Sequence, residues 1–240
     1  MTIAFDDLRT PHDRGALFAA LSQARLQDEA TERLGGEFDY QADLEADVLV
    51  FTGQRTGRTI ETSVELIASV APGPGTVVWG RALPAGGRAG AERLVELGRA
   101  DGLASLTADE VPFPVLGDGA ASAAMAAIEI SAVVATATGG GITYVVSAGA
   151  SAAVLLLGAL DFAVPRIDHT FPTRVAAALG AGTISDHRAA VHGLAVMSGW
   201  TAAWADDWTS VALADPVTGH AAELDFDEYA RLANLRASLG

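Results

Sequence analysis

The sequence predicts an α+β protein in which an antiparallel β-meander and further β-hairpins pack with helices. Residues 59–70 alternate between apolar and polar side chains, which is the period of a strand with one face in water. Shorter apolar runs separated by turn residues lie on both sides of it, so the strands are expected to pair with their sequence neighbours. Helical patterns precede, interrupt and follow the strands, an order that differs from regular βαβ alternation.

A helix is predicted over residues 10–34. Thr10 is expected as its cap, Pro11 suits the first helical position, and Asp13 stands three residues after the cap. The glycines at 35 and 36 are expected to end the helix. A loose apolar stripe is expected to face the core, namely Leu17, Leu21, Ala24 and Leu34.

The meander is predicted to follow as four strands, at residues 38–40, 48–51, 59–70 and 76–79, with a Pro/Gly turn before the last. The wet face of the long strand is expected to carry Glu61, Glu65 and Ile67, among others. Because a catalytic carboxylate pair needs a cleft that separates two pKa values, Glu61 and Glu65 are interpreted as solvated residues.

Loops are predicted at residues 84–90 and 112–119, with a short helix at 92–99 between them. The second loop is the best candidate for a boundary between two lobes, residues 1–112 and 119–240. One continuous domain is the open alternative.

The second half is predicted to begin with a buried helix of small residues at 120–137 and an apolar hairpin at 142–147 and 153–157. Helices are expected at 174–179 and at 186–197, the latter with Ser185 as its cap. A hairpin at 210–214 and 220–226 follows, and then a final helix at 227–239 in which Leu232 and Leu235 face the core.

The composition excludes several chemistries. The 240 residues include no cysteine and no lysine, and the net charge is −15. Without lysine there is no Walker A loop and no Schiff base, and without cysteine there is no thiolate, disulfide or iron–sulfur cluster. No cofactor is predicted, and the negative charge opposes nucleic acid as a partner.

A cytoplasmic location is expected, because residues 1–14 are acidic and do not resemble a signal peptide. Residues 130–160 carry no charge and are long enough to cross a bilayer. Three glycines interrupt this run and its flanking charges are acidic, so a buried helix and hairpin are preferred to a membrane span.

The segment from Gly75 to Trp79 reads Gly-Thr-Val-Val-Trp, and residues 221–228 form an acidic strand after a hairpin. With the N-terminal helix, these features resemble a family of uncharacterised actinobacterial proteins, a domain of unknown function. That family often has a second tryptophan where this chain has Arg81. The resemblance implies the same α+β fold and no particular activity.

A catalytic alternative is a serine hydrolase. Residues 149–153 read Gly-Ala-Ser-Ala-Ala and resemble a nucleophile elbow, with Ser151 as nucleophile and Asp168 and His187 as partners. An elbow requires a parallel sheet, so a hairpin turn is the preferred interpretation. No metal site is predicted, because His187 and His192 would lie about 140° apart on a helix.

Trp200, Trp204 and Trp208 are four residues apart and would form one aromatic stripe on a helix. They are interpreted either as core packing or as an exposed anchor for a partner protein, with Asp206 and Asp207 at its rim. The sequence therefore favours a soluble, non-enzymatic protein that acts by contact with another protein. The alternatives are the hydrolase and a carrier with an apolar pocket between hairpin and helix.

Overall fold

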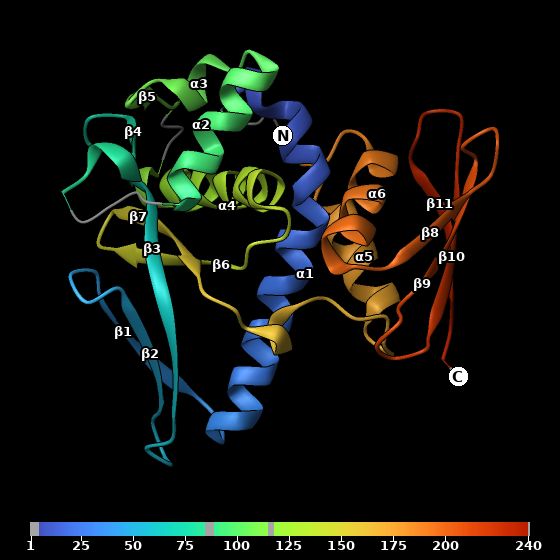
Figure 1. The fold of residues 1–240 in the computed structure, drawn as a ribbon, viewed down its shortest axis with the longest axis horizontal. Coiled ribbons are helices and arrows are strands. Elements are labelled where there is room, and N and C mark those ends of the chain that lie inside the picture. The colour runs from blue at the N-terminus through green and yellow to red at the C-terminus, as the bar shows by residue number, and fades with distance from the viewer. Residues whose placement is uncertain (1–4, 85–88, 115–117, 240) are drawn as a thin grey trace.

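The computed structural model describes residues 5–84, 89–114 and 118–239. Within them the chain forms six α-helices and eleven strands, and every strand pair is antiparallel. The α+β class is therefore confirmed. Figure 1 shows the long helix α1 between two groups of elements, with a seven-stranded sheet on one side and a four-stranded sheet on the other.

Helix α1 (Arg9–Leu34) follows a 3-10 turn, η1 (Asp6–Leu8). The expected cap is wrong: the helix starts one residue before Thr10, and its N-cap Leu8 provides no side-chain hydrogen bond. Its end is as predicted, since Gly35 has a left-handed φ of 78° and its N–H bonds back to the last turn.

The meander is confirmed and gains one strand, β5, which was not predicted and ends at the first residue of the predicted loop 112–119. Strand β3 is the longest and pairs with β2 along its first half and with β4 near its end. Strand β5 extends the sheet beyond β4. The five strands are β1 (Phe38–Asp43), β2 (Val48–Gly53), β3 (Thr59–Ala71), β4 (Thr76–Trp79) and β5 (Glu110–Pro112).

The predicted wet face of β3 is wrong at two positions. Ile67 is fully buried, because a bulge interrupts the pairing with β7 between Leu66 and Ala68 and helix α2 (Ala89–Asp101) packs over this part of the strand. Glu65 is half-buried and accepts hydrogen bonds from the first residues of α2. The 3-10 turn η2 (Gly80–Ala82) and helix α3 (Ala104–Thr107) complete this side.

Helix α4 (Gly119–Thr138) and the hairpin β6 (Thr143–Ala148) and β7 (Ser151–Leu157) are confirmed. Strand β7 pairs with β3, so the hairpin joins the meander in one sheet. Residues 121–138 of α4 are long and apolar enough to cross a membrane, and 56% of this window is buried inside the protein. A core helix of a soluble protein has the same properties, so the helix is weak evidence for a span.

The C-terminal part contains the 3-10 turn η3 (Asp161–Ala163), two helices and the second sheet. Helix α6 is capped by Asp186, whose side chain accepts the Ala189 N–H, and not by Ser185. The sheet order is β11-β10-β9-β8. The elements are α5 (Phe171–Gly180), α6 (His187–Ser198), β8 (Thr201–Trp204), β9 (Ser210–Ala214), β10 (Ala221–Phe226) and β11 (Leu232–Ser238).

The predicted final helix is wrong: residues 232–238 form strand β11. A bulge at the β10–β11 pairing leaves Leu232 opposite Phe226 and Leu235 opposite Leu224. The bulge therefore brings two leucines spaced three apart onto one face of a strand, and spacing three is also the signature of a helix. The turn before the strand is held by Asp227, whose carboxylate accepts two backbone N–H groups.

The division into lobes 1–112 and 119–240 stays a prediction. Strands β3 and β7, which lie on opposite sides of the proposed boundary, pair at six residues of β3 between Val64 and Val70, with a bulge at Ile67. Parts of the two predicted loops, residues 85–88 and 115–117, lie outside the described part of the chain; the second of these segments belongs to the proposed boundary.

Candidate functional site

A cavity of about 510 Å³ lies between α1, α4, β6 and the segment that begins at the end of α5. The cavity exists because seven of the residues that line it are alanines, whose methyl side chains leave the space unfilled. Three come from α1, two from α4 and two from the end of α5: Ala16, Ala19, Ala20, Ala124, Ala132, Ala178 and Ala181. Longer side chains at these positions would fill the space.

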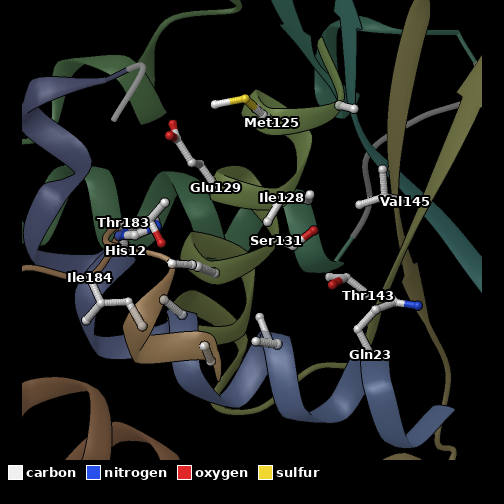
Figure 2. Close-up of a pocket in the computed structure, with 17 residues that line it drawn as sticks. His12, Gln23, Met125, Ile128, Glu129, Ser131, Thr143, Val145, Thr183 and Ile184 are labelled. Atoms are coloured by element: carbon white, nitrogen blue, oxygen red, sulfur yellow. The ribbon is translucent and has the colours of Figure 1, made fainter. Parts of the chain in front are cut away.

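Larger apolar side chains form the rest of the wall (Figure 2). Met125 and Ile128 project from α4, Val145 from β6 and Ile184 from the segment after α5. Ile128 is 62% exposed and Met125 is 37% exposed, so apolar surface of α4 meets solvent here. The cavity can therefore admit an apolar molecule from outside.

Six polar side chains interrupt the apolar wall. Figure 2 places His12, Thr183 and Glu129 toward one side of the cavity, and Thr143 and Gln23 toward the other, with Ser131 between them. The Ser131 hydroxyl donates to the Ala127 carbonyl within α4. No arginine is among the described residues that line the cavity.

Asp13 organises the side on which His12 lies. Its carboxylate is 4% exposed and accepts hydrogen bonds from Ser185 N–H (3.2 Å), Asp186 N–H (3.1 Å) and the Ser185 hydroxyl. Burial alone would raise the pKa of Asp13, but these bonds and His12 outweigh burial, so its pKa lies below the usual value. The carboxylate thus fastens the segment after α5, which carries Thr183 and Ile184, to α1.

The same carboxylate accepts a hydrogen bond from His12. Nδ1 of His12 lies 3.2 Å from Asp13 Oδ1. Because an ionised carboxylate only accepts hydrogen bonds, Nδ1 of His12 is the donor in this contact. His12 is 3% exposed and lines the cavity.

Glu129 lies on the same side as His12. It is the one charged residue in the sequence of α4 and is 7% exposed. His12 and Glu129 also line a second, very small hollow of about 10 Å³ beside the cavity. A carboxyl group and an imidazole ring therefore share one end of an otherwise apolar site.

The three tryptophans do not form one stripe, because the segment from Trp200 to Trp208 is not helical. Trp200 follows α6, is 6% exposed and packs edge-to-face on Phe171 at 5.6 Å. Trp204 lies on β8, and Trp208 lies in the turn before β9 with a φ of 59°. Trp204 and Trp208 nevertheless meet, with ring centroids 4.9 Å apart, and Trp208 is 51% exposed.

The proposed catalytic residues are not brought together by any hydrogen bond among the described residues. Ser151 opens β7 opposite Ala148 in a tight antiparallel hairpin, which is not the strand-to-helix turn of a nucleophile elbow. Asp168 binds Thr170 and Arg25, and His187 Nδ1 accepts the Leu232 N–H. Within the described residues, no group of three or more His, Asp or Glu is placed to hold a metal ion.

The residues of the cavity were not predicted from the sequence. An apolar pocket between hairpin and helix was one predicted alternative, and the cavity lies between β6 and α4, completed by α1. Two signals were present in the sequence: the density of alanine in residues 16–20 and 120–137, and the single acid of the second segment, Glu129.

A family model described as a family of unknown function (DUF6882) matches residues 10–160. The match runs from the first turn of α1 to just beyond β7. It includes the motif from Gly75 to Trp79, whereas residues 221–228 lie outside it. No curated protein and no solved structure matches the chain.

Proposed function

The chain belongs to DUF6882, a family of unknown function, and we propose that it binds a small apolar ligand in the cavity between α1, α4 and β6. The observation that carries this proposal is the cavity itself. Its volume of about 510 Å³ lies within the range of small-molecule sites, roughly 300–1,000 Å³. Its lining, mainly apolar with a few convergent polar groups, is also typical of such sites.

The loss of stability that an unfilled cavity causes supports the same function. Protein interiors are normally packed as densely as organic crystals, and space of this size loses contacts that larger side chains would make. Exposed apolar surface at Met125 and Ile128 adds to this cost, because it stays hydrated. A bound apolar molecule would restore the contacts and release the water.

A matched pair of alanine substitutions on α4 tests the proposal. Ala124 lines the cavity, whereas Ala121, one turn earlier, is exposed and does not line it. N-phenyl-1-naphthylamine, an uncharged apolar fluorophore, is expected to bind the wild type saturably at one site. Ala124→Phe should weaken binding at least about tenfold, or 1.4 kcal/mol, while Ala121→Phe leaves it unchanged.

Thermal unfolding provides a second readout. A ligand at about 100 times its Kd adds roughly 2.7 kcal/mol of stability, so the wild type should melt at a higher temperature with the probe present. Ala124→Phe should fold and show no such shift. Equal binding of the probe by the wild type and Ala124→Phe would show that it binds outside the cavity. The absence of saturable binding to the wild type would contradict the proposed function.

Contact with a protein partner is a second candidate function, favoured by the aromatic pair Trp204 and Trp208. Trp208 is 51% exposed, although its ring contacts the tilted ring of Trp204, and tryptophan is enriched at binding hot spots. Asp206 and Asp207 are exposed beside it, and the net charge is −15, so the expected partner is basic.

Native mass spectrometry of the protein isolated gently from its own host tests this second candidate. A basic protein should co-purify at fixed stoichiometry with the wild type and be lost with Trp208→Ala. Tyr229→Ala is the control, because Tyr229 is 72% exposed and makes no ring contact with the tryptophan pair. Retention of the partner by Trp208→Ala would contradict this candidate. The cysteine-free composition supports a cytoplasmic location for either function.

A further inference from the structure

We infer that the ligand of this cavity is an apolar molecule with a hydroxyl group, and that this group forms a hydrogen bond with the hydroxyl of Thr143. The inference rests on the proposed function and names the class of ligand. It is carried by the position of Thr143, which is 4% exposed and lines the cavity. Its side chain has no hydrogen-bond partner among the described residues.

The strand directs this hydroxyl toward the cavity. Successive side chains of a strand point to opposite faces, so Thr143 and Val145 of β6 share one face, and both line the cavity. Tyr144, between them, points the other way and packs edge-to-face on Tyr40 and Phe51. Figure 2 places Thr143 on the side of the cavity that is opposite His12.

The hydroxyl is also open to a ligand. Within the described part of the chain, three unpartnered polar side-chain atoms are buried out of contact with solvent, namely Arg188 Nε, Ser198 Oγ and Trp200 Nε1. The Thr143 oxygen is not among them, so it keeps accessible surface, and this surface belongs to the cavity that the residue lines. Ser131 is the contrast, because its hydroxyl already donates to the Ala127 carbonyl.

A buried hydroxyl favours some apolar molecules over others. A hydrocarbon that filled the cavity would leave the Thr143 hydroxyl without a partner, and an unpaired buried polar group costs free energy. A ligand hydroxyl at this place both donates and accepts, as the threonine hydroxyl does, so the two can pair in either direction. A site that pairs with a ligand hydroxyl therefore rejects the analogue that lacks it.

Gln23 of α1 supports the same class of ligand. Figure 2 places it on the same side of the cavity as Thr143. It is half-buried, and its side-chain amide has no hydrogen-bond partner among the residues that the structure describes. The amide provides a donor and an acceptor that do not titrate, which again suits a neutral polar group.

Two compounds with the same ring system test the inference. 1-Naphthalenemethanol and 1-ethylnaphthalene differ only in a terminal hydroxyl against a terminal methyl group. Each is titrated against N-phenyl-1-naphthylamine bound to the wild type. A wholly apolar cavity would favour the hydrocarbon, because a methyl group gains free energy on leaving water and an unpaired hydroxyl loses it. We expect instead that the alcohol displaces the probe at the same or a lower concentration.

Tighter binding of the hydrocarbon by the wild type would overturn the inference and leave the proposed function in place. Displacement of the probe by neither compound would overturn both. This comparison needs no variant and decides the question even if a substitution at Thr143 prevents folding.

Thr143→Val removes the hydroxyl and keeps the shape of the side chain. It should weaken binding of the alcohol at least about fivefold, or about 1 kcal/mol, and leave binding of the hydrocarbon unchanged or tighter. Thr143→Ser is the matched control, since it retains the hydroxyl and should keep the ratio of the two affinities within about twofold of the wild type. The wild-type ratio in Thr143→Val would contradict a hydrogen bond to this hydroxyl.

Discussion

Glu65 shows how one residue acquires a role through its neighbours. Its two carboxylate oxygens accept the N–H groups of Gly90 (2.9 Å) and Ala91 (3.0 Å) at the beginning of α2. The first N–H groups of a helix have no partner within the helix and carry the positive end of its dipole. Glu65 therefore caps α2 from a different element, strand β3.

Glu65→Ala should lower the free energy of unfolding by about 1–2 kcal/mol, the usual cost of losing a helix cap. The matched control is Glu61→Ala on the same strand, because Glu61 is exposed and surface substitutions usually change stability by less than about 0.5 kcal/mol. Urea denaturation followed by circular dichroism measures both. Equal effects of the two variants would show that the bonds to α2 contribute nothing.

His187 links folding to pH. Burial, together with the positive charge of Arg231, lowers the pKa of His187 below its usual value, although nearby carboxylates act in the opposite direction. The bond at Nδ1 agrees, since that nitrogen accepts the Leu232 N–H at 3.0 Å and cannot do so when protonated. The opposing carboxylates are those of Asp186, Asp227 and Asp13.

The sign follows from the depressed pKa. Below about pH 6.5, the ordinary value, the unfolded chain binds a proton that folded His187 does not, so stability is lost as the pH falls through the folded pKa. Glutamine can accept the same N–H without titrating. His187→Gln should therefore flatten the dependence of unfolding free energy on pH between about 7.5 and 5, by at most about 1.4 kcal/mol per pH unit. An unchanged slope would contradict this assignment.

At the scale of elements, glycines let α1 approach two other helices closely. A Cβ on Gly15 of α1 would lie 1.9 Å from the carbonyl oxygen of Ala132 in α4. A Cβ on Gly193 of α6 would lie 2.0 Å from the carbonyl oxygen of Arg14 in α1. Both obstacles are backbone atoms, which cannot move without moving the helix.

Gly15→Ala should lower the free energy of unfolding by about 3 kcal/mol, because it overpacks the contact between α1 and α4. Gly180→Ala is the control: Gly180 is the last residue of α5, and a Cβ there would meet nothing within 4 Å. The control should be neutral or stabilise by up to about 1 kcal/mol. Denaturant midpoints compare the two, and a Gly15→Ala variant as stable as the control would refute the close contact.

For the whole molecule, three elements contribute to both hydrophobic cores. Strand β7 places Leu155 in one core and Val154 in the other, and α4 divides its residues in the same way. Strand β3 does so too, with Val64 in the first core and Ile67 in the second. Unfolding of either core would therefore disrupt β3, β7 and α4, which also supply residues to the other core.

We expect the chain to unfold in one cooperative transition. Trp79→Phe leaves only the three tryptophans of the C-terminal part, at positions 200, 204 and 208, as fluorescence reporters. Their transition in urea should coincide with the loss of far-ultraviolet circular dichroism, which reports on all helices and strands. Separate midpoints would instead support independent lobes at the proposed boundary.

The helix and the hairpin that form part of the cavity wall were predictable from the sequence, but the position of the cavity was not. The apolar helix of residues 120–137 and the hairpin after it follow from composition, and Glu129 is visible as the one acid among small residues. A cavity, however, is space that remains among several elements. Its position depends on how α1, α4, β6 and the end of α5 pack, and no local pattern encodes that distance.

The sequence by itself determined the α+β class, the first helix, the meander and the hairpins β6–β7 and β9–β10. It could do so because apolar periodicity and turn residues act over a few neighbouring positions. Tertiary structure decided the rest. Residues 232–238 became a strand because β10 offered an edge and a bulge aligned Leu232 with Leu235. Glu65 became a cap because α2 begins beside it. Both outcomes depend on partners distant in sequence, whose contacts outweigh local preference.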